Sequence, residues 1–172
     1  GLLLSALKEA SAGARAEDNL QKEIKDLIKK QADFICSELQ KGNGEFSDGR
    51  WVTKILRKEG AGAAEDGLVL QTGGIMGILS AYEVIPDDKY LKSAKRGWDY
   101  LERHLWSDEL GIYRSRLKGE SLTYTPLTAG VTIGALSRLI KYLPEEKESI
   151  LAHLSYIGDR KLNQAGIEGL NN

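Results

Sequence analysis

Two glycine-containing apolar segments repeat within the chain, and this repeat is the feature that most restricts its fold. The segment from Thr72 to Ser80 aligns with the segment from Thr128 to Ser137, with one inserted residue. The period is 57 residues, measured from Gly77 to Gly134. A period of this length is typical of folds that stack copies of one supersecondary unit, because a single copy cannot bury its apolar surface alone.

Both repeated segments are predicted to be inner helices. Residues 68–84 and 127–143 are apolar nearly all round until their last turns, as in a helix that is surrounded by other helices. Each segment carries two glycines four residues apart: Gly73 and Gly77 in the first, Gly130 and Gly134 in the second. Because glycine has no side chain, we expect neighbouring backbones to approach closely at these positions, in a soluble fold rather than a membrane dimer.

Amphipathic outer helices are predicted around these inner ones. The first starts near Asp18, and its apolar residues recur at steps of three and four: Leu20, Ile24, Leu27, Ile28, Phe34, Ile35 and Leu39. The second starts at Asp87 and Asp88, and its apolar seam is Tyr90, Leu91, Ala94, Trp98, Leu101 and Leu105. A third amphipathic segment runs from Glu145 to Ile157. The remaining face of each helix is mostly charged or polar and is expected to contact solvent.

Each unit is therefore an outer helix, a long loop and an inner helix. A glycine followed by alternating apolar residues, as in Gly44-Glu45-Phe46 and Gly111-Ile112-Tyr113, predicts a short extended strand within each loop. Loops this long inside a compact domain commonly bind ligands or carry catalytic groups. The predicted fold is all-α, with about two and a half tandem antiparallel helical hairpins over residues 18–157. Residues 1–17 are predicted to be an extension or linker, and residues 158–172 a tail.

The second unit resembles a known superfamily. Residues 88–106, which read DKYLKSAKRGWDYLERHLW, and the turn through Tyr113 are similar to the sugar-processing branch of the α/α toroids. This superfamily includes six-hairpin glycosidases, sugar epimerases, terpenoid cyclases and protein prenyltransferases. The segment from Gln40 to Trp51 also resembles the Gln/Trp-type turns of the cyclase branch. The resemblance implies a partial α/α toroid. Because family members close a ring with more hairpins than this chain supplies, we expect a homo-oligomer or a subunit of a larger complex.

The same resemblance implies candidate site residues in the loops that lead into the inner helices. The candidate catalytic residues are Glu65, Asp66, Glu120 and Tyr124, and the candidate ligand-binding residues are Asp48, Trp51 and Tyr113. Two carboxylates beside a glycosidic bond could divide the acid and base roles, and aromatic rings could stack on a sugar. Structural alternatives stay open, since Asp66 could cap a turn and Trp51 could fill a gap between hairpins.

Composition excludes several other classes of function. The chain has 24 basic and 25 acidic residues, so its net charge of -1 gives no global attraction to nucleic acid or to an anionic membrane. One cysteine, Cys36, and two histidines, His104 and His153, cannot supply a disulfide framework or a multi-histidine metal centre. We therefore expect no metal and no cofactor. The longest uncharged stretches are too short and too polar to span a bilayer.

The amino-terminal segment leaves the compartment open. Leu2 to Leu7 followed by Ala14-Arg15-Ala16 is similar to a signal core and its cleavage site, which would place the chain outside the cytoplasm. A short amphipathic turn followed by a loose linker is the alternative. For function, we expect a binding or assembly module that uses the long loops. The alternative is a carbohydrate-active hydrolase or isomerase with a glycan ligand, whose cleft is completed by oligomerisation.

Overall fold

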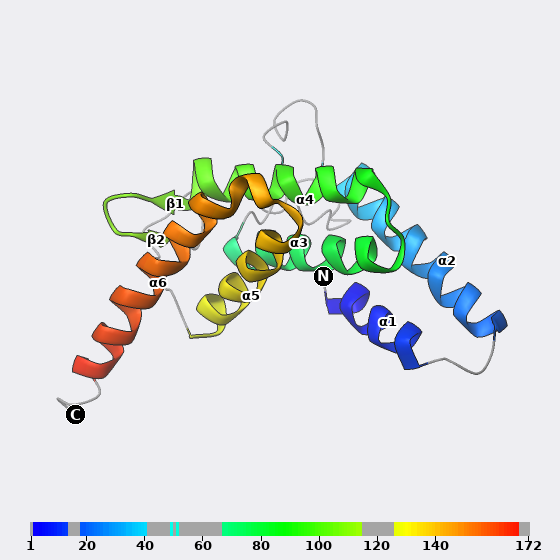
Figure 1. Ribbon diagram of the computed structural model, residues 1–172, viewed down its shortest axis with the longest axis horizontal. Helices are drawn as coiled ribbons and strands as arrows, with labels where there is room; N and C mark the ends of the chain where they lie inside the picture. Colours follow the sequence, from blue (N-terminus) through cyan, green and yellow to red (C-terminus); the bar gives the residue numbers. More distant parts are fainter. Residues whose placement is uncertain are drawn as a thin grey trace, which may run out of the picture.

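The computed structural model describes residues 2–13, 18–40, 49, 51, 67–114 and 126–168. Within these ranges the chain is mostly helical, and successive helices pack antiparallel (Figure 1). The helices are α1 (Leu2–Gly13), α2 (Asp18–Phe34), α3 (Leu68–Val84), α4 (Asp88–Tyr100), α5 (Pro126–Tyr142) and α6 (Lys147–Glu168). The prediction of an all-α fold built from tandem helical hairpins is confirmed.

Helix α3 is the centre of the fold. It packs against α1, α4 and α5, and its side chains Ile75, Ile78 and Leu79 are fully buried. The sequence predicted a helix over residues 68–84 with neighbours on several sides, and the structure confirms both the bounds and the surroundings. The second inner helix, α5, packs between α3 and α6 and leaves Ile133 exposed.

Helix α1 packs on α3 and shares a two-residue match with both inner helices. Its Leu4-Ser5 pair aligns with Leu79-Ser80 of α3 and with Leu136-Ser137 of α5. Leu4 is buried in the core, and the Ser5 and Ser80 hydroxyls lie 3.1 Å apart. Residues 1–17, expected from the sequence to be an extension or linker, thus include a helix that packs on α3. At the other end, α6 continues to Glu168, within the range expected to be a tail.

The second outer helix begins and packs as its sequence predicts. Asp87 precedes α4 and caps it, since its carboxylate accepts a hydrogen bond from the Lys89 N–H at 3.0 Å. The predicted seam is buried at Tyr90, Ala94, Trp98, Leu101 and Leu105. This seam attaches α4 to α3 along the length of both helices.

The outer helices α2 and α4 each end in a π-helical turn. Helix α2 continues as η1 (Ile35–Leu39) and α4 continues as η3 (Leu101–Leu105). In each case the N–H that follows the turn donates to a carbonyl five residues earlier, from Gln40 to Ile35 and from Trp106 to Leu101. Matching ends of this kind are a second, independent sign of the repeat. Each widened turn stands at the carboxyl-terminal end of its outer helix.

A short hairpin follows η3. Strands β1 (Trp106–Ser107) and β2 (Ile112–Tyr113) pair antiparallel, with Trp106 opposite Tyr113. Gly111 turns the chain with a φ of +59°, a conformation that L side chains rarely adopt. The predicted extended segment at Ile112–Tyr113 is therefore confirmed, whereas the corresponding Gly44-Glu45-Phe46 lies outside the described residues.

Three of the four glycines predicted to allow close packing do not do so. A Cβ added to Gly73, Gly130 or Gly134 would meet no atom within 4 Å, so the expectation of close backbone approach there is wrong. A Cβ on Gly74 would instead come within 2.7 Å of the Trp51 ring, and one on Gly97 within 2.1 Å. The glycines that matter are those on the facing sides of α3 and α4, because the Trp51 indole occupies the space between these helices.

Candidate functional site

The structure describes two of the candidate site residues. Trp51 and Tyr113 are both buried, each with 1% of its surface exposed. The other candidates lie outside the described residues: Asp48, Glu65, Asp66, Glu120 and Tyr124. Trp51 lies between α2 and α3 in the sequence and Tyr113 lies in β2, and they belong to different parts of the core.

Trp51 is held to α3 by a pair of hydrogen bonds. Its backbone N–H donates to Gln71 Oε1 at 2.8 Å, and Gln71 Nε2 donates to the Trp51 carbonyl at 2.7 Å. Its ring lies against Gly74 and Gly97. Trp51 therefore fills a gap between helices. This is the structural alternative that the sequence left open for it.

A second buried glutamine holds the same loop to α4. Gln40 Nε2 donates to the carbonyls of Gly49 at 2.7 Å and Ser93 at 2.9 Å. Its Oε1 accepts hydrogen bonds from Ser93 Oγ at 2.5 Å and Arg96 Nη2 at 3.0 Å. All four hydrogen bonds are made by a side chain that is almost completely buried, so they are worth more than they would be in water. Gly49 and Trp51 are thus each attached to a helix by a buried glutamine side chain.

Tyr113 belongs to a group of aromatic side chains that we call the aromatic cluster. The cluster joins the end of α4, the β1–β2 hairpin and α6, and its members are Trp98, Trp106, Tyr113, His153 and Tyr156. The Trp106 and His153 rings are stacked, with centroids 3.8 Å apart and an interplanar angle of 9°. The Tyr113 hydroxyl lies 2.7 Å from His153 Nδ1. Trp106 packs edge-on against Tyr113 at 5.0 Å.

The inner side of the aromatic cluster favours a neutral imidazole. His153 is 8% exposed, and burial lowers its pKa below the ordinary 6.5, although the charges of Glu102 and Asp108 act in the opposite direction. A neutral ring whose Nδ1 accepts the Tyr113 proton fits this environment. The sequence alone does not reveal this contact, because nothing in the local pattern links His153 to a tyrosine 40 residues earlier.

The outer side of the aromatic cluster is accessible. Tyr156 is 53% exposed, and Trp106 is partly exposed. Trp106 Nε1 donates to Asp108 Oδ1 at 2.8 Å, in an exposed hydrogen bond. The tryptophan ring is therefore fixed on one face by His153 and at its nitrogen by a carboxylate. Such a rigid aromatic surface with polar groups at its margin can stack on a flat apolar face and hydrogen-bond to hydroxyls.

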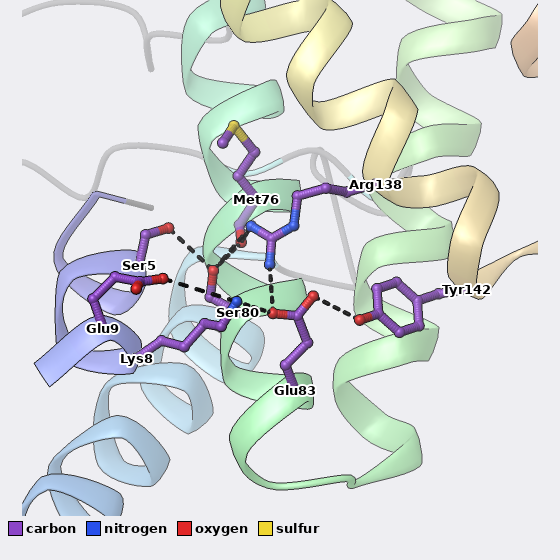
Figure 2. A network of polar contacts seen from close by, with 8 residues as sticks. All are labelled: Ser5, Lys8, Glu9, Met76, Ser80, Glu83, Arg138 and Tyr142. Atoms are coloured by element: carbon purple, nitrogen blue, oxygen red, sulfur yellow. Dashed lines mark hydrogen bonds and ion pairs between the residues drawn. The ribbon is translucent and has the colours of Figure 1, made fainter. Parts of the chain in front are cut away.

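A polar network links the inner helices, and Figure 2 shows its members pointing toward one another from α1, α3 and α5. Glu83 is its centre: its carboxylate is paired with Lys8 Nζ at 2.5 Å and with Arg138 Nη2 at 3.0 Å, and it accepts the Tyr142 hydroxyl at 2.6 Å. Arg138 Nη1 also donates to the Ser80 hydroxyl at 3.0 Å and to the Met76 carbonyl at 3.2 Å.

This network holds Glu83 ionised. Burial acts to raise the pKa of the carboxyl, but the hydrogen bonds from Lys8, Tyr142 and Arg138 outweigh it and lower the pKa to about 2. Lys8 and Glu83 follow the aligned Ser5 and Ser80 by three residues each, so the ion pair joins equivalent positions of neighbouring inner helices. The network therefore stabilises the stack of inner helices.

A shallow surface depression lies beside the carboxyl-terminal part of α2. It is lined by Asp33, Cys36, Ser37 and Lys89. Asp33 accepts hydrogen bonds from Tyr90 at 2.7 Å and Lys29 at 2.6 Å, and it pairs with Lys89 at 2.7 Å. Burial raises the pKa of the Cys36 thiol, so the thiol is not activated as a nucleophile.

Neither a metal-binding group nor a membrane-spanning helix occurs among the residues that the structure describes. Among those residues, no group of three or more His, Cys, Asp or Glu side chains is placed to hold a metal ion. None of the helices seen in these ranges has the length and apolar character needed to cross a membrane.

Comparisons with known proteins give one solved structure to set beside this fold. No family model matches the chain, and the curated proteins contain no significant match. The chain is similar to a solved polysaccharide lyase, with a TM-score of 0.62 and 16% sequence identity. The similarity covers 79% of this chain and 22% of the lyase, so the chain spans about a fifth of that protein's length. At this identity the likeness shows the fold.

Proposed function

We propose that the chain is a carbohydrate-binding module of α/α-toroid type, and that the aromatic cluster is its sugar-contacting surface. The observation that carries the proposal is the fixed, partly exposed ring of Trp106, stacked on His153 and bordered by the exposed Tyr156. The apolar faces of pyranose rings pack on such aromatic side chains, which provide a large contact area and lose little conformational entropy.

The position of the aromatic cluster supports this proposal. Trp106 and Tyr113 lie in the hairpin that leads from an outer helix toward an inner helix. Loops at this end of a scaffold are the usual carriers of binding groups, since the helices fix their starting points. The likeness to a polysaccharide lyase supports a carbohydrate as the class of ligand.

A glycan array followed by calorimetric titration tests the proposal. With a glycan that binds the wild type, Trp106→Ala should weaken binding about tenfold, because it removes an aromatic stacking contact worth about 1.4 kcal/mol. Leu151→Ala is the matched control, since Leu151 is an exposed apolar residue of α6 outside the aromatic cluster. If no glycan binds, or if both variants bind like the wild type, the proposal fails.

The likeness to a lyase also supports a second candidate, a carbohydrate-active enzyme. In that case Glu65, Asp66, Glu120 and Tyr124 would carry the chemistry, and Asp48 would help to bind the substrate. Turnover of a glycan that is abolished by Glu65→Gln or Glu120→Gln would support catalysis. Binding without turnover, unchanged by both substitutions, would favour the binding module.

We further propose that the chain works as a homo-oligomer or within a larger complex. Large apolar side chains are exposed on several helices, among them Leu20, Leu27 and Phe34 of α2 and Ile133 of α5. Contiguous exposure of apolar residues is typical of surfaces that contact another protein. Sedimentation that shows a folded monomer at micromolar concentration would contradict this proposal.

A further inference from the structure

Helix α2 carries an exposed apolar stripe in addition to its buried face. Leu20, Leu27 and Phe34 follow one another at intervals of seven residues, and their exposed fractions are 42%, 42% and 47%. Ile24 and Gln31 fall between them and are partly exposed. This alternation of four and three residues is the spacing of the contact positions in a coiled coil.

The stripe adjoins the side of α2 that packs on its own core. That side is made by Ile28 and Ala32, which are fully buried, and Ile24 packs partly against the same core. The helix thus has enough apolar residues for two contacts, and the fold of one chain uses one of them. We call the second surface, formed by Leu20, Ile24, Leu27, Gln31 and Phe34, the α2 stripe.

Two exposed charges beside the α2 stripe indicate what covers it. Glu23 and Lys30 lie on the same margin of the stripe, seven residues apart and with opposite charge. In an antiparallel pair of α2 helices, Ile24 would face Leu27 of the second copy, and Leu20 would face Gln31 of the second copy. The same register sets Glu23 opposite Lys30 of the second copy, and the two-fold axis repeats this pair.

A parallel pair lacks this match. The position opposite Glu23 would then be Ile28 of the second copy, which is already buried in its own core. The match of Glu23 with Lys30 therefore favours a second copy of this chain as the occupant, in the antiparallel direction.

We propose that a second copy of this chain docks on the α2 stripe, with the two α2 helices antiparallel. The inference rests on the self-association proposed above and is independent of sugar binding, since the aromatic cluster lies on other elements. It names the surface, the partner and the two ionic contacts, Glu23 with Lys30 and their symmetric equivalents.

Analytical ultracentrifugation of the full chain tests the surface. Leu27→Lys should raise the dimer dissociation constant at least a hundredfold, because it introduces two charges at the centre of the interface. Leu151→Lys places the same charge at an exposed leucine of α6 and should leave the dissociation constant within about twofold of the wild type. Circular dichroism of each variant verifies that the helices are retained.

A charge exchange tests the direction. Glu23→Lys or Lys30→Glu alone replaces two attractions by two repulsions and should raise the dissociation constant about tenfold at low salt. The double variant restores both pairs and should return to within about threefold of the wild type. Recovery in the double variant supports the antiparallel register, whereas additive weakening overturns it.

The remaining outcomes separate this inference from the proposals above. An oligomer that persists unchanged in Leu27→Lys overturns the α2 interface and leaves self-association through another surface. A folded wild-type monomer overturns both. Glycan binding, measured on the same samples, is unaffected by either result.

Discussion

The Tyr113 hydroxyl lies 2.7 Å from His153 Nδ1, and this contact ties the β1–β2 hairpin to α6. Both side chains are buried, and Trp106 covers the imidazole by stacking. The position of the most accessible tryptophan of the aromatic cluster therefore depends on a hydrogen bond beneath it. The first two predictions concern this pair.

Tyr113→Phe should lower the free energy of unfolding by about 1–2 kcal/mol, since it leaves a buried imidazole nitrogen without its hydroxyl partner. Urea denaturation followed by circular dichroism measures the change. Tyr156→Phe removes a hydroxyl from an exposed ring of the same cluster and should change stability little. Equal effects of the two substitutions would show that the buried contact does not contribute.

His153 should make the fold less stable as pH falls below its ordinary pKa of 6.5. Because burial lowers the folded-state pKa, the unfolded chain binds a proton first, and stability that is complete above pH 6.5 declines on acidification. The slope contributed by this residue is at most about 1.4 kcal/mol per pH unit. Urea midpoints at pH 7.5 and 5.5, compared between wild type and His153→Gln, measure it. If the urea midpoint changes between the two pH values by the same amount in His153→Gln as in the wild type, His153 is not the source of the pH dependence.

Two glycine-to-alanine substitutions should change the free energy of unfolding in opposite directions. Gly97→Ala should lower the free energy of unfolding by more than about 1 kcal/mol, because the new methyl would meet the Trp51 ring. Gly73→Ala should raise it by about 0.5–1 kcal/mol, since the methyl enters open space and alanine favours the helix. Thermal or urea unfolding of both variants provides the comparison, and destabilisation by Gly73→Ala would show that α3 is more closely covered there.

Glu83→Gln should lower the free energy of unfolding by about 2–3 kcal/mol, because it removes the carboxylate that pairs with Lys8 and Arg138. In the wild type, this contribution is present above the ordinary pKa of 4.5 and is lost as pH falls toward the folded value of about 2. Glu9→Gln is the control, as Glu9 is largely exposed and lies 4.0 Å from Lys8. An acid transition identical in Glu83→Gln and wild type would contradict the role of the network.

Much of the helical framework could be predicted from the sequence. The bounds of α3 match the apolar segment, and the start of α4 matches the Asp87-Asp88 pair, because apolar periodicity and caps are local signals. The role of α1 was not predicted, although its Leu4-Ser5 aligns with Leu79-Ser80. A repeat that matches at two residues becomes visible only when the structure sets Ser5 beside Ser80.

The contacts that build the aromatic cluster and the packing at glycines could not be predicted in the same way. Glycine spacing on one helix does not say which side of that helix faces another element. The spacing therefore predicts close packing at Gly73, whereas the contact is made at Gly74. The Tyr113–His153 hydrogen bond joins residues of different units, and no pattern within either segment encodes it. For Glu65, Asp66, Glu120, Tyr124 and Asp48, the site predictions stay predictions.

The amide of Gln71 exchanges two hydrogen bonds with the main chain of Trp51, as the neighbouring strand would in a β-ladder. The point at which the loop meets α3 is thus set by one side chain on a buried helix. Because both hydrogen bonds come from the Gln71 side chain and are made to main-chain atoms, the attachment does not depend on which side chain stands at position 51.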